Sequence, residues 1–437
     1  MSSSFQEVAL LVYYRRLNRY SFNALVGAIE TERTLDLLPI YFANNPQEFR
    51  EELHSLVTKF RKVIVALSFM TCQLFEMQRL VSSLKKRFAS KALFIAGGPH
   101  ATGDPCSTLN MGFDIVVRGE GEQTFPEIIS RLMLGEDCSS VSGTTFLKDM
   151  VCVSNPLGKR PDINHYPPFA VKHRKFGPIE ISRGCPWTCR FCQTPYIFGV
   201  RVRHRSIMNI CKYVQVMKDQ GLTDIRFISS NAFMYGSRDG KTLEIDVMEE
   251  LLKSVREVLS HKGRIFFGTF PSEVRPESVT PETIELVSKY CDNDNIVIGG
   301  QSGSERILDQ TCRGHGVEEI RRAVKLTIES GLKANVDLIF GLPGETEKDV
   351  HLTLQLAKEL TKMGARIHAH TFMPLVGTPF KDMPPGKIRP EAKMELERLV
   401  SIGKVYGQWR SQEAIARRTA GFMRKTYKNR ENQNRPC

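Results

Sequence analysis

Three cysteines, Cys185, Cys189 and Cys192, lie within eight residues in the string Ile181-Ser-Arg-Gly-Cys-Pro-Trp-Thr-Cys-Arg-Phe-Cys192. Their C-x-x-x-C-x-x-C spacing suits three corners of one [4Fe–4S] cube, because thiolates are the soft ligands that iron–sulfur iron takes. The fourth iron would then have no protein ligand, and an open metal position is a place for chemistry. Structural zinc or unligated thiols are the alternative, but zinc needs a fourth nearby Cys or His, and the next cysteine is Cys211.

Upstream of this motif, three polar loops each follow an apolar run. The loops are Leu67-Ser68-Phe69-Met70-Thr71, Gly97-Gly98-Pro99-His100 and Arg118-Gly119-Glu120-Gly121-Glu122. In a doubly wound sheet, ligands bind beyond the carboxyl ends of the strands, and glycine lets the backbone approach a ligand closely. The three loops therefore predict a ligand site at one edge of a parallel sheet.

The elements that must position these loops alternate along the chain. In residues 1–155, apolar runs separated by amphipathic stretches such as Leu74–Phe88 predict a Rossmann-like, doubly wound α/β domain. The expected strands there are Val8–Tyr14, Leu35–Phe42, Val63–Phe69, Ala92–Ala96 and Ile115–Val117. In residues 165–385 the alternation resumes, which predicts a partial (β/α)6 barrel with the cysteine motif after its first strand. The expected strands here are Ile179–Ser182, Asp224–Ser229, Arg264–Gly268, Asn295–Ile298, Asn335–Phe340 and Arg366–Met373.

Composition bounds the function. The 437 residues are 41% hydrophobic and 25% charged, no apolar run approaches the ~20 residues of a membrane span, and no secretory signal is evident. Eleven cysteines without a pairing pattern favour reduced thiols in a cytoplasm. The net charge is +13, and a basic helical extension is expected over residues 386–437, with eight basic and two acidic residues after Trp409. Such a segment suits docking of a macromolecule, most simply a protein, while nucleic acid stays open and a membrane is not expected.

The cysteine string resembles the radical S-adenosylmethionine (SAM) superfamily, in which the open iron chelates the amino and carboxylate groups of SAM. The upstream loops resemble the cobalamin-binding domain of the cobalamin-dependent radical SAM enzymes. This resemblance implies cobalamin contacts from Ser68, Thr71, Gly97, Gly98, His100, Gly119, Glu120, Gly121 and Glu122. The D-x-H-x-x-G string of His-ligated cobalamin proteins is missing, so we interpret His100 as a loop residue near the nucleotide tail rather than a cobalt ligand.

Three later strings resemble methylthiotransferases and related cobalamin enzymes: Gly299–Leu308 with Arg313, Asp337–Glu347 and Phe372–Pro379. The resemblance implies that the SAM ribose meets Gln301 and Ser302, its carboxylate Arg313, and its adenine Phe191, Gly341 and Pro374. Ser229 or Asn231 would bind the methionyl amine, although the string around them departs from the usual acidic pattern. His368 and His370 alternate on an expected strand, so both could face the barrel interior.

The resemblance implies a methyltransferase that uses two SAM molecules, one to form methylcobalamin and one to make a 5′-deoxyadenosyl radical. Its product would be a C-methylated, unactivated carbon, such as that of a glutamine residue in methyl-coenzyme M reductase, and it would need an external electron donor. The alternatives are a methylthiotransferase acting on RNA or protein, another cobalamin-dependent radical reaction such as cyclisation, and a non-catalytic corrinoid-binding protein.

Overall fold

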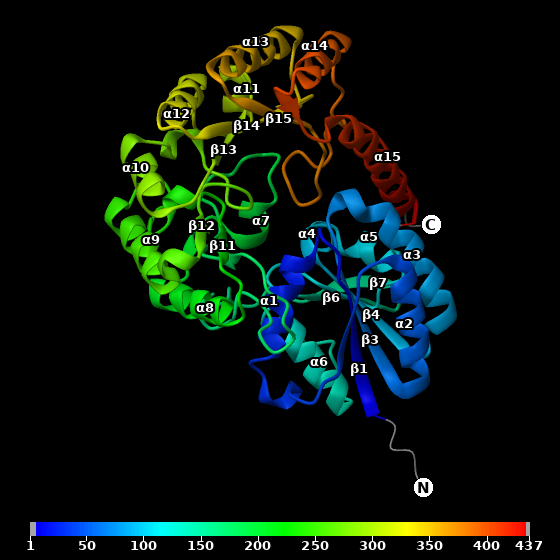
Figure 1. Ribbon diagram of the computed structural model, residues 1–437. Coiled ribbons are helices and arrows are strands. Elements are labelled where there is room, and N and C mark those ends of the chain that lie inside the picture. Colours follow the sequence, from blue (N-terminus) through cyan, green and yellow to red (C-terminus); the bar gives the residue numbers. More distant parts are fainter. Residues whose placement is uncertain (1–5, 434–437) are drawn as a thin grey trace. The chain divides into compact units, whose positions relative to one another are not determined.

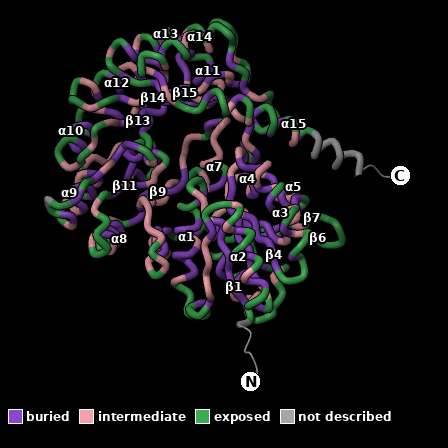
Figure 2. The backbone as a smooth tube through the Cα atoms, turned by 45° about the vertical axis from the view of Figure 1, so that its right-hand side comes forward, coloured by how far each residue is buried: buried purple, intermediate pink, exposed green. Residues whose placement is uncertain are grey.

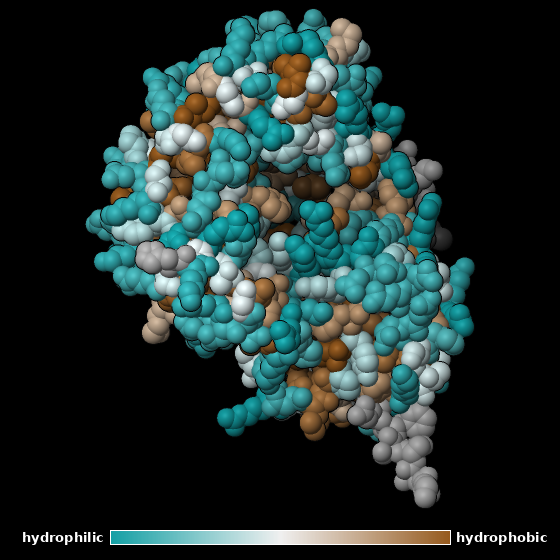
Figure 3. All heavy atoms as spheres, viewed as in Figure 1, coloured by the Kyte–Doolittle hydropathy of each residue, from teal (hydrophilic) through white to brown (hydrophobic). Residues whose placement is uncertain are grey.

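The computed structural model describes residues 6–433 and divides the chain into two compact units (Figure 1). Unit 1 holds the chain up to Gly177 together with Leu375–Gly377, and unit 2 holds Pro178–Pro374 and the chain from Thr378 onward. Hydrophilic side chains dominate the surface of each unit in the view of Figure 3, with hydrophobic ones in small groups. None of the helices within the described residues combines the length and apolarity that a membrane crossing requires.

Unit 1 is built on a sheet of order β2-β1-β3-β4-β5-β6-β7. Its first five strands are parallel, and they are β1 (Gln6–Tyr13), β2 (Ile40–Ala43), β3 (Phe60–Ser68), β4 (Ala92–Gly97) and β5 (Ile115–Val117). The predicted α/β class with a parallel sheet is therefore confirmed. The expected strand Leu35–Phe42 is wrong at its start, because Arg33–Leu35 forms a 3-10 helix and the strand begins only at Ile40.

Helices cover both faces of this sheet. Leu10 and Val12 of β1 point toward α1 (Arg19–Ile29) and α6 (Thr124–Leu134). The residues that alternate with them, Ala9, Leu11 and Tyr13, are fully buried on the opposite face. That face is covered by α2 (Pro46–Lys59) and α3 (Leu74–Phe88), and the ring of Tyr13 contacts Phe49 of α2. Both faces of the strands are thus apolar, as a parallel sheet requires.

The antiparallel hairpin β6 (Thr144–Lys148) and β7 (Val151–Ser154) extends the sheet beyond β5 and was not predicted. Its turn residues Asp149 and Met150 have φ values of 50° and 62°, a conformation usually signalled by Asn-Gly or Asp-Gly. A disulfide joins Cys106 of α5 (Pro105–Asn110) to Cys152 of β7. The expectation that all cysteines are reduced is therefore wrong for this pair, which lies 46 residues apart and could not be read from spacing.

Unit 2 contains the six predicted barrel strands, all parallel in two sheets of order β12-β11-β8 and β13-β14-β15-β16. They are β8 (Ile179–Glu180), β11 (Asp224–Ile228), β12 (Arg264–Phe266), β13 (Asn295–Gln301), β14 (Lys333–Phe340) and β15 (Arg366–Thr371). A parallel bridge between Val274, on the loop that follows β12, and Ile298 of β13 continues the strand order from the first sheet to the second, in agreement with the partial barrel. The antiparallel pair β9 (Ser182–Arg183) and β10 (Arg203–His204) follows β8.

The strands of unit 2 are covered by amphipathic helices whose inner faces are buried and whose outer faces are exposed (Figure 2). These are α8 (Ile207–Asp219), α9 (Ile245–Leu259), α10 (Pro281–Tyr290), α12 (Val317–Glu329) and α13 (Glu347–Met363). Helix α13 starts at a capping box in which Thr346 accepts from the Asp349 amide and its own amide donates to the Asp349 carboxylate. The alternation of strand and helix places every strand-end loop at one edge of the barrel.

The C-terminal extension is helical, as expected, and it also contains one short strand. Between α14 (Pro390–Ser401) and α15 (Trp409–Gln433), the short strand β16 (Val405–Tyr406) pairs with β15 and adds an edge to the sheet. Trp409 is 1% exposed, and its carbonyl oxygen accepts from the Thr371 hydroxyl at 2.7 Å. Of the predicted basic residues, Lys425, Lys428, Arg430 and Arg435 have side chains outside the described part of the chain.

Because Trp409 anchors α15 to β15, we expect Trp409→Ala to lower the free energy of unfolding of unit 2 by about 3–5 kcal/mol, the usual cost of emptying a large aromatic site. The neighbouring exposed Arg410 is the matched control, and Arg410→Ala should change stability by less than about 0.5 kcal/mol. Urea denaturation followed by circular dichroism measures both. Equal, small effects would show that the extension is not part of the barrel.

Candidate functional site

The cysteine motif lies in the loop between β9 and α7 (Thr194–Phe198), beyond the carboxyl end of β8, as predicted. Backbone hydrogen bonds fix the loop, since the Cys185 amide donates to the Gly199 carbonyl at 3.0 Å and the Cys192 amide donates to the Cys189 carbonyl at 3.0 Å. Gly184 has φ +97°, and a Cβ there would lie 2.5 Å from the Arg201 carbonyl oxygen. Only glycine therefore fits directly before the first cysteine.

The three thiols share one electrostatic environment. Burial raises the pKa of the Cys185 thiol to about 11, and the neighbouring Cys192 and Cys189 raise it too. Burial likewise raises the pKa of Cys192. Thiolates are the ligand form, so the loop needs positive charge, and iron would supply it. A donor set of three sulfurs in one enclosed loop fits a [4Fe–4S] cube with one open iron.

Arg313 supplies positive charge from the protein. Its buried guanidinium donates to Cys189 Sγ at 3.6 Å and to the Gly299 carbonyl oxygen at 2.6 Å, which ties the cysteine loop to β13. Its Nε donates to Nε2 of His315, whose pKa burial and then the Arg313 charge lower to about 3, so this imidazole is neutral. Arg275 donates to the Arg313 carbonyl oxygen and lies 4.1 Å from the Trp187 ring centroid.

The other predicted SAM residues are dispersed over neighbouring strand ends of the barrel. Phe191 packs against the apolar cluster of Ile307, Leu342, Phe372 and Phe380. Gln301 ends β13 with φ +72°. The Ser302 hydroxyl, by contrast, is buried against Thr353 of α13 at 3.3 Å and accepts from the Ser304 amide, so the protein itself uses it. Pro374 is buried at the last position of unit 2 before Leu375.

The predicted second-strand residues sit beyond β11. The Ser229 hydroxyl donates to the Asn231 carbonyl oxygen at 3.0 Å. The Asn231 side-chain oxygen accepts from the Arg275 amide and the Ser278 hydroxyl, whereas its Nδ2 is buried without a hydrogen-bond partner among the residues that the structure describes. Since buried donors are normally paired, this free N–H₂ fits a ligand acceptor.

Gly341 forms the turn after β14, with φ +74° and its amide donating to the Glu345 carboxylate at 2.7 Å. Burial raises the pKa of Glu345 to about 7. Lys387 and Arg389 lie beside the same turn and line a hollow with it. The contact of Gly341 with adenine stays a prediction.

In unit 1, the first two predicted loops contact each other directly. His100 Nδ1 lies 3.2 Å from the Thr71 hydroxyl, and the imidazole stacks on Phe69 with ring centroids 5.3 Å apart. A Cβ on Gly98 would lie 2.6 Å from the Ser68 hydroxyl oxygen. Around Gly97, an added Cβ would meet only the Val117 carbonyl oxygen, at 3.9 Å, so the backbone there is open to a ligand.

His100 itself is enclosed by protein. Its exposed fraction is 0%, its Nε2 has no hydrogen-bond partner within the described part of the chain, and burial lowers its pKa to about 4. A metal ligand needs a lone pair that the metal can reach, and this imidazole offers none at the surface. His100 lies in helix α4 (Gly98–Gly103) and not in a loop as expected, and its enclosure does not suit an axial ligand.

The third predicted loop follows β5. The Gly119 amide donates to the Thr102 hydroxyl of α4 (Gly98–Gly103) at 3.0 Å, so this loop is tied to the second one. Glu120 accepts from Arg160 at 3.0 Å, and Glu122 is buried. A Cβ on Gly121 would lie 2.8 Å from the Leu25 side chain. The predicted residues thus gather at the adjacent ends of β3, β4 and β5, where they fit a large ligand approached by backbone.

One group of functional side chains was only half foreseen. Asp337 of β14 lies opposite His368 of β15, with His370 two residues further along. Among the described residues, these three form the one set of Cys, His, Asp or Glu whose ligand atoms all lie within 4.8 Å of one another. The alternation of the two histidines along one expected strand predicted that they share a face. Asp337 lies beside them only because of the register between β14 and β15, which the sequence does not show.

Comparisons with known proteins find one family match in each unit. The radical SAM superfamily matches residues 179–357, and the B12 binding domain matches residues 25–129. An uncharacterized methyltransferase of Pyrococcus horikoshii is 27% identical over 324 residues, covering 71% of this chain and 67% of that protein. A tRNA-2-methylthio-N(6)-dimethylallyladenosine synthase of Moorella thermoacetica is 34% identical over 250 residues, covering 52% and 50%. The chain spans between half and two thirds of the length of these relatives.

Two solved structures share the fold. The methyltransferase TsrM of Kitasatospora setae, with cobalamin and a [4Fe–4S] cluster bound, has a TM-score of 0.65 at 16% identity and covers 86% of this chain and 74% of its own. The cobalamin-dependent SAM radical enzyme OxsB has a TM-score of 0.60 at 16% identity and covers 81% and 52%. The chain thus carries a B12-binding domain for cobalamin and a radical SAM domain for SAM and a [4Fe–4S] cluster.

Protein reconstituted without oxygen should bind about four irons, because one cube is expected. Replacing Cys185, Cys189 and Cys192 together by alanine should remove them, whereas Cys211→Ala, outside the loop, should not. Iron analysis and the visible absorbance of the cluster are the measurements. Substantial cluster absorbance in the triple variant would mean a second cluster elsewhere.

The cob(II)alamin form of the loaded protein should lack the nitrogen superhyperfine splitting of an axial imidazole, because His100 is enclosed. Electron paramagnetic resonance measures this directly. His100→Gln should leave the spectrum unchanged. A splitting that this variant abolishes would identify His100 as the ligand and show that the loop opens to bind cobalt.

Proposed function

We propose that this chain, which carries a B12-binding domain in unit 1 and a radical SAM domain in unit 2, is a methyltransferase that adds a methyl group to an unactivated carbon. The observation that carries the proposal is the pairing of two sites on one chain. One is a three-cysteine loop held against Arg313, and the other is a set of glycine loops open at Gly97. The Pyrococcus horikoshii relative, named a methyltransferase, supports the same reaction class.

When bound, SAM at the cluster supplies the radical that removes hydrogen from a C–H bond, and cobalamin supplies the methyl group. The protein's own residues bind and enclose these groups. The thiols of Cys185, Cys189 and Cys192 would hold the cluster and leave one iron open for SAM. Arg313 keeps positive charge beside Cys189. Trp187, with Arg275 and Lys241 over its ring at 4.1 and 4.7 Å, shields the loop from water.

The substrate that we propose is an amino-acid residue in a protein. In support, Arg410, Arg417 and Arg424 lie on exposed turns of α15, where their charge can steer an acidic partner. Glutamine in methyl-coenzyme M reductase is the specific case that the sequence resemblance suggests. An external electron donor must reduce the cluster in any such reaction.

A methylthiotransferase is the second candidate, because the Moorella thermoacetica relative matches about half of this chain. Enzymes of that type carry three extra cysteines in their first domain for a second cluster. Here the Cys106–Cys152 disulfide leaves Cys72 and Cys138 as the free cysteines among the described residues of unit 1. Even when that bond is reduced, the four cysteines of unit 1 are spread singly along the sequence and are unlike the spacing of a cluster motif, so we favour carbon methylation.

The decisive experiment uses SAM with a deuterated methyl group and the reconstituted, cobalamin-loaded protein under reducing conditions. We expect one S-adenosylhomocysteine and one 5′-deoxyadenosine for each deuterated methyl group found on a carbon of the acceptor protein by mass spectrometry. The triple cysteine variant should form no 5′-deoxyadenosine. A methylthio product, or methyl transfer without 5′-deoxyadenosine, would contradict the proposal.

A further inference from the structure

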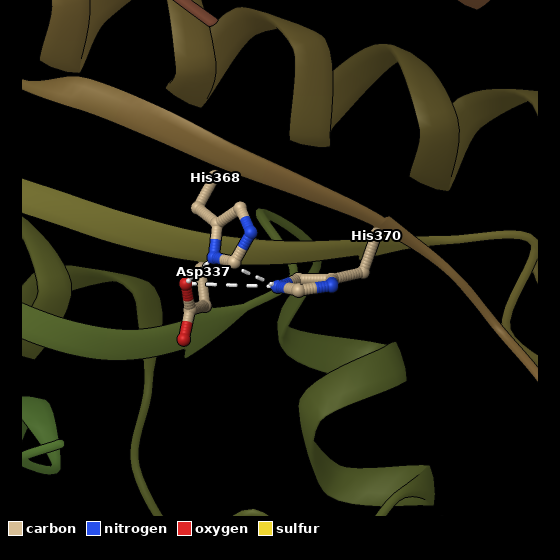
Figure 4. A group of neighbouring side chains, drawn as sticks. All are labelled: Asp337, His368 and His370. Carbon is tan, nitrogen blue, oxygen red and sulfur yellow. Dashed lines mark hydrogen bonds and ion pairs between the residues drawn. The ribbon is translucent and has the colours of Figure 1, made fainter. Parts of the chain in front are cut away.

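Asp337, His368 and His370 converge on the inner side of two neighbouring barrel strands (Figure 4). Asp337 and His368 are directly opposite in the parallel ladder, and Ile367 and Ala369, which alternate with the histidines, are fully buried on the other face of β15. Asp337 Oδ1 lies 2.9 Å from His368 Nδ1 and 3.7 Å from His370 Nε2, and the two ring nitrogens are 3.1 Å apart.

The position of the proton on His370 follows from Gln412 of α15. The Gln412 side-chain oxygen accepts from the Thr371 backbone amide at 2.9 Å, which fixes which way round the amide group points. Its Nε2 therefore donates to His370 Nδ1, at 3.3 Å. Since neutral imidazole has one N–H, the proton of His370 lies on Nε2, facing Asp337 and His368.

The proton on His368 follows from Asp337, whose side chain is 7% exposed. Burial raises the pKa of this carboxyl, but hydrogen bonds from His368 and His370 outweigh it and the pKa is lowered, so the group is a carboxylate. It accepts the N–H of His368 Nδ1 at 2.9 Å, and the N–H of His370 Nε2 is directed to the same carboxylate oxygen, 3.7 Å away, so the two N–H groups converge on Asp337 and not on each other. The other nitrogen of His368, Nε2, keeps its lone pair and has no hydrogen-bond partner among the described residues.

The surroundings hold this ring in place. Tyr406 of β16 stacks on His368 with centroids 4.6 Å apart and planes 4° apart, and Arg366 lies behind the Tyr406 ring at 4.9 Å. Burial raises the pKa of Tyr406 to about 12, so it stays neutral. Glu273, on the loop beyond β12, is exposed to solvent. It interacts electrostatically with both Asp337 and His368.

We propose that Asp337 and His368 form a proton-accepting dyad in the radical SAM domain, and that His368 Nε2 binds an N–H or O–H group of the substrate and takes its proton. His370 and Gln412 act as positioning residues. In the transfer, the substrate N–H or O–H bond breaks with its electron pair left on the substrate, and a new N–H bond forms on Nε2. The Asp337 carboxylate offsets the imidazolium charge, and neither partner is oxidised or reduced. The substrate assignment rests on the proposed function; the dyad does not.

Two imidazoles and one carboxylate are also a donor set for a divalent metal ion. As a metal ligand through Nε2, however, His370 would carry its proton on Nδ1, where the Gln412 amide N–H₂ already points a donor at it. Two donors would then face each other. The hydrogen bonds therefore favour the dyad, and metal binding becomes an outcome of the test.

The test reads the proton positions by nitrogen-15 magnetic resonance of the loaded, histidine-labelled protein, with His368→Gln and His370→Gln to assign the signals. We expect opposite tautomers: Nδ1–H on His368 and Nε2–H on His370. Gln412→Leu should release the His370 tautomer and leave that of His368 unchanged. The same tautomer on both histidines, or one equivalent of Zn²⁺ retained through gel filtration and lost in Asp337→Asn, would overturn the dyad.

Access and role are measured separately. Diethyl pyrocarbonate, which acylates unprotonated imidazole, should modify His368 at least about tenfold faster than His370, whose nitrogens both face partners. His368→Gln should lower methyl transfer per SAM cleaved by about 100-fold or more, the usual size of an acid–base contribution. An unreactive His368 or an unchanged ratio would overturn the proposal. If the protein methylates nothing, the tautomer and acylation results still decide whether the dyad exists.

Discussion

The structure of unit 2 depends on holding three cysteine thiols together in an enclosed loop, where burial opposes the charged form that binds metal. Arg313 meets this constraint from the protein side, since it bonds Cys189 and the Gly299 carbonyl at once. Arg275 donates a hydrogen bond to the Arg313 carbonyl oxygen, and neutral His315 accepts one from Nε of Arg313. A chain of buried cations and acceptors therefore joins the cysteine loop to β13 and to the loop that follows β12.

Much of the fold could be predicted because strands that are buried on both faces leave continuous apolar runs. Strand Ile115–Val117 and helix Leu74–Phe88 appear within the predicted bounds. The prediction is wrong where an apolar run is not a strand, as at Leu35, and where a turn lacks its usual residues, as at Asp149 and Met150. Strand β16 has two residues, too few to give a period.

The site was predictable where its residues are close in sequence and not where strands bring them together. The cysteine loop and the glycine loops are local strings, so their place at strand ends followed from the fold class. The contact between Thr71 and His100, the use of Ser302 by α13 and the meeting of Asp337 with His368 arise from tertiary packing. Spacing carries no information about such pairs, because strand register is set by the whole sheet.

The Cys106–Cys152 bond has a consequence for handling the protein. The thiols and strong reductants used to load and charge an iron–sulfur cluster also attack disulfides by exchange. A preparation made ready for turnover is therefore also one in which the edge hairpin of unit 1 is released from α5. Reducing treatment of a sample thus sets both the oxidation state of the cluster in unit 2 and the state of the Cys106–Cys152 disulfide in unit 1.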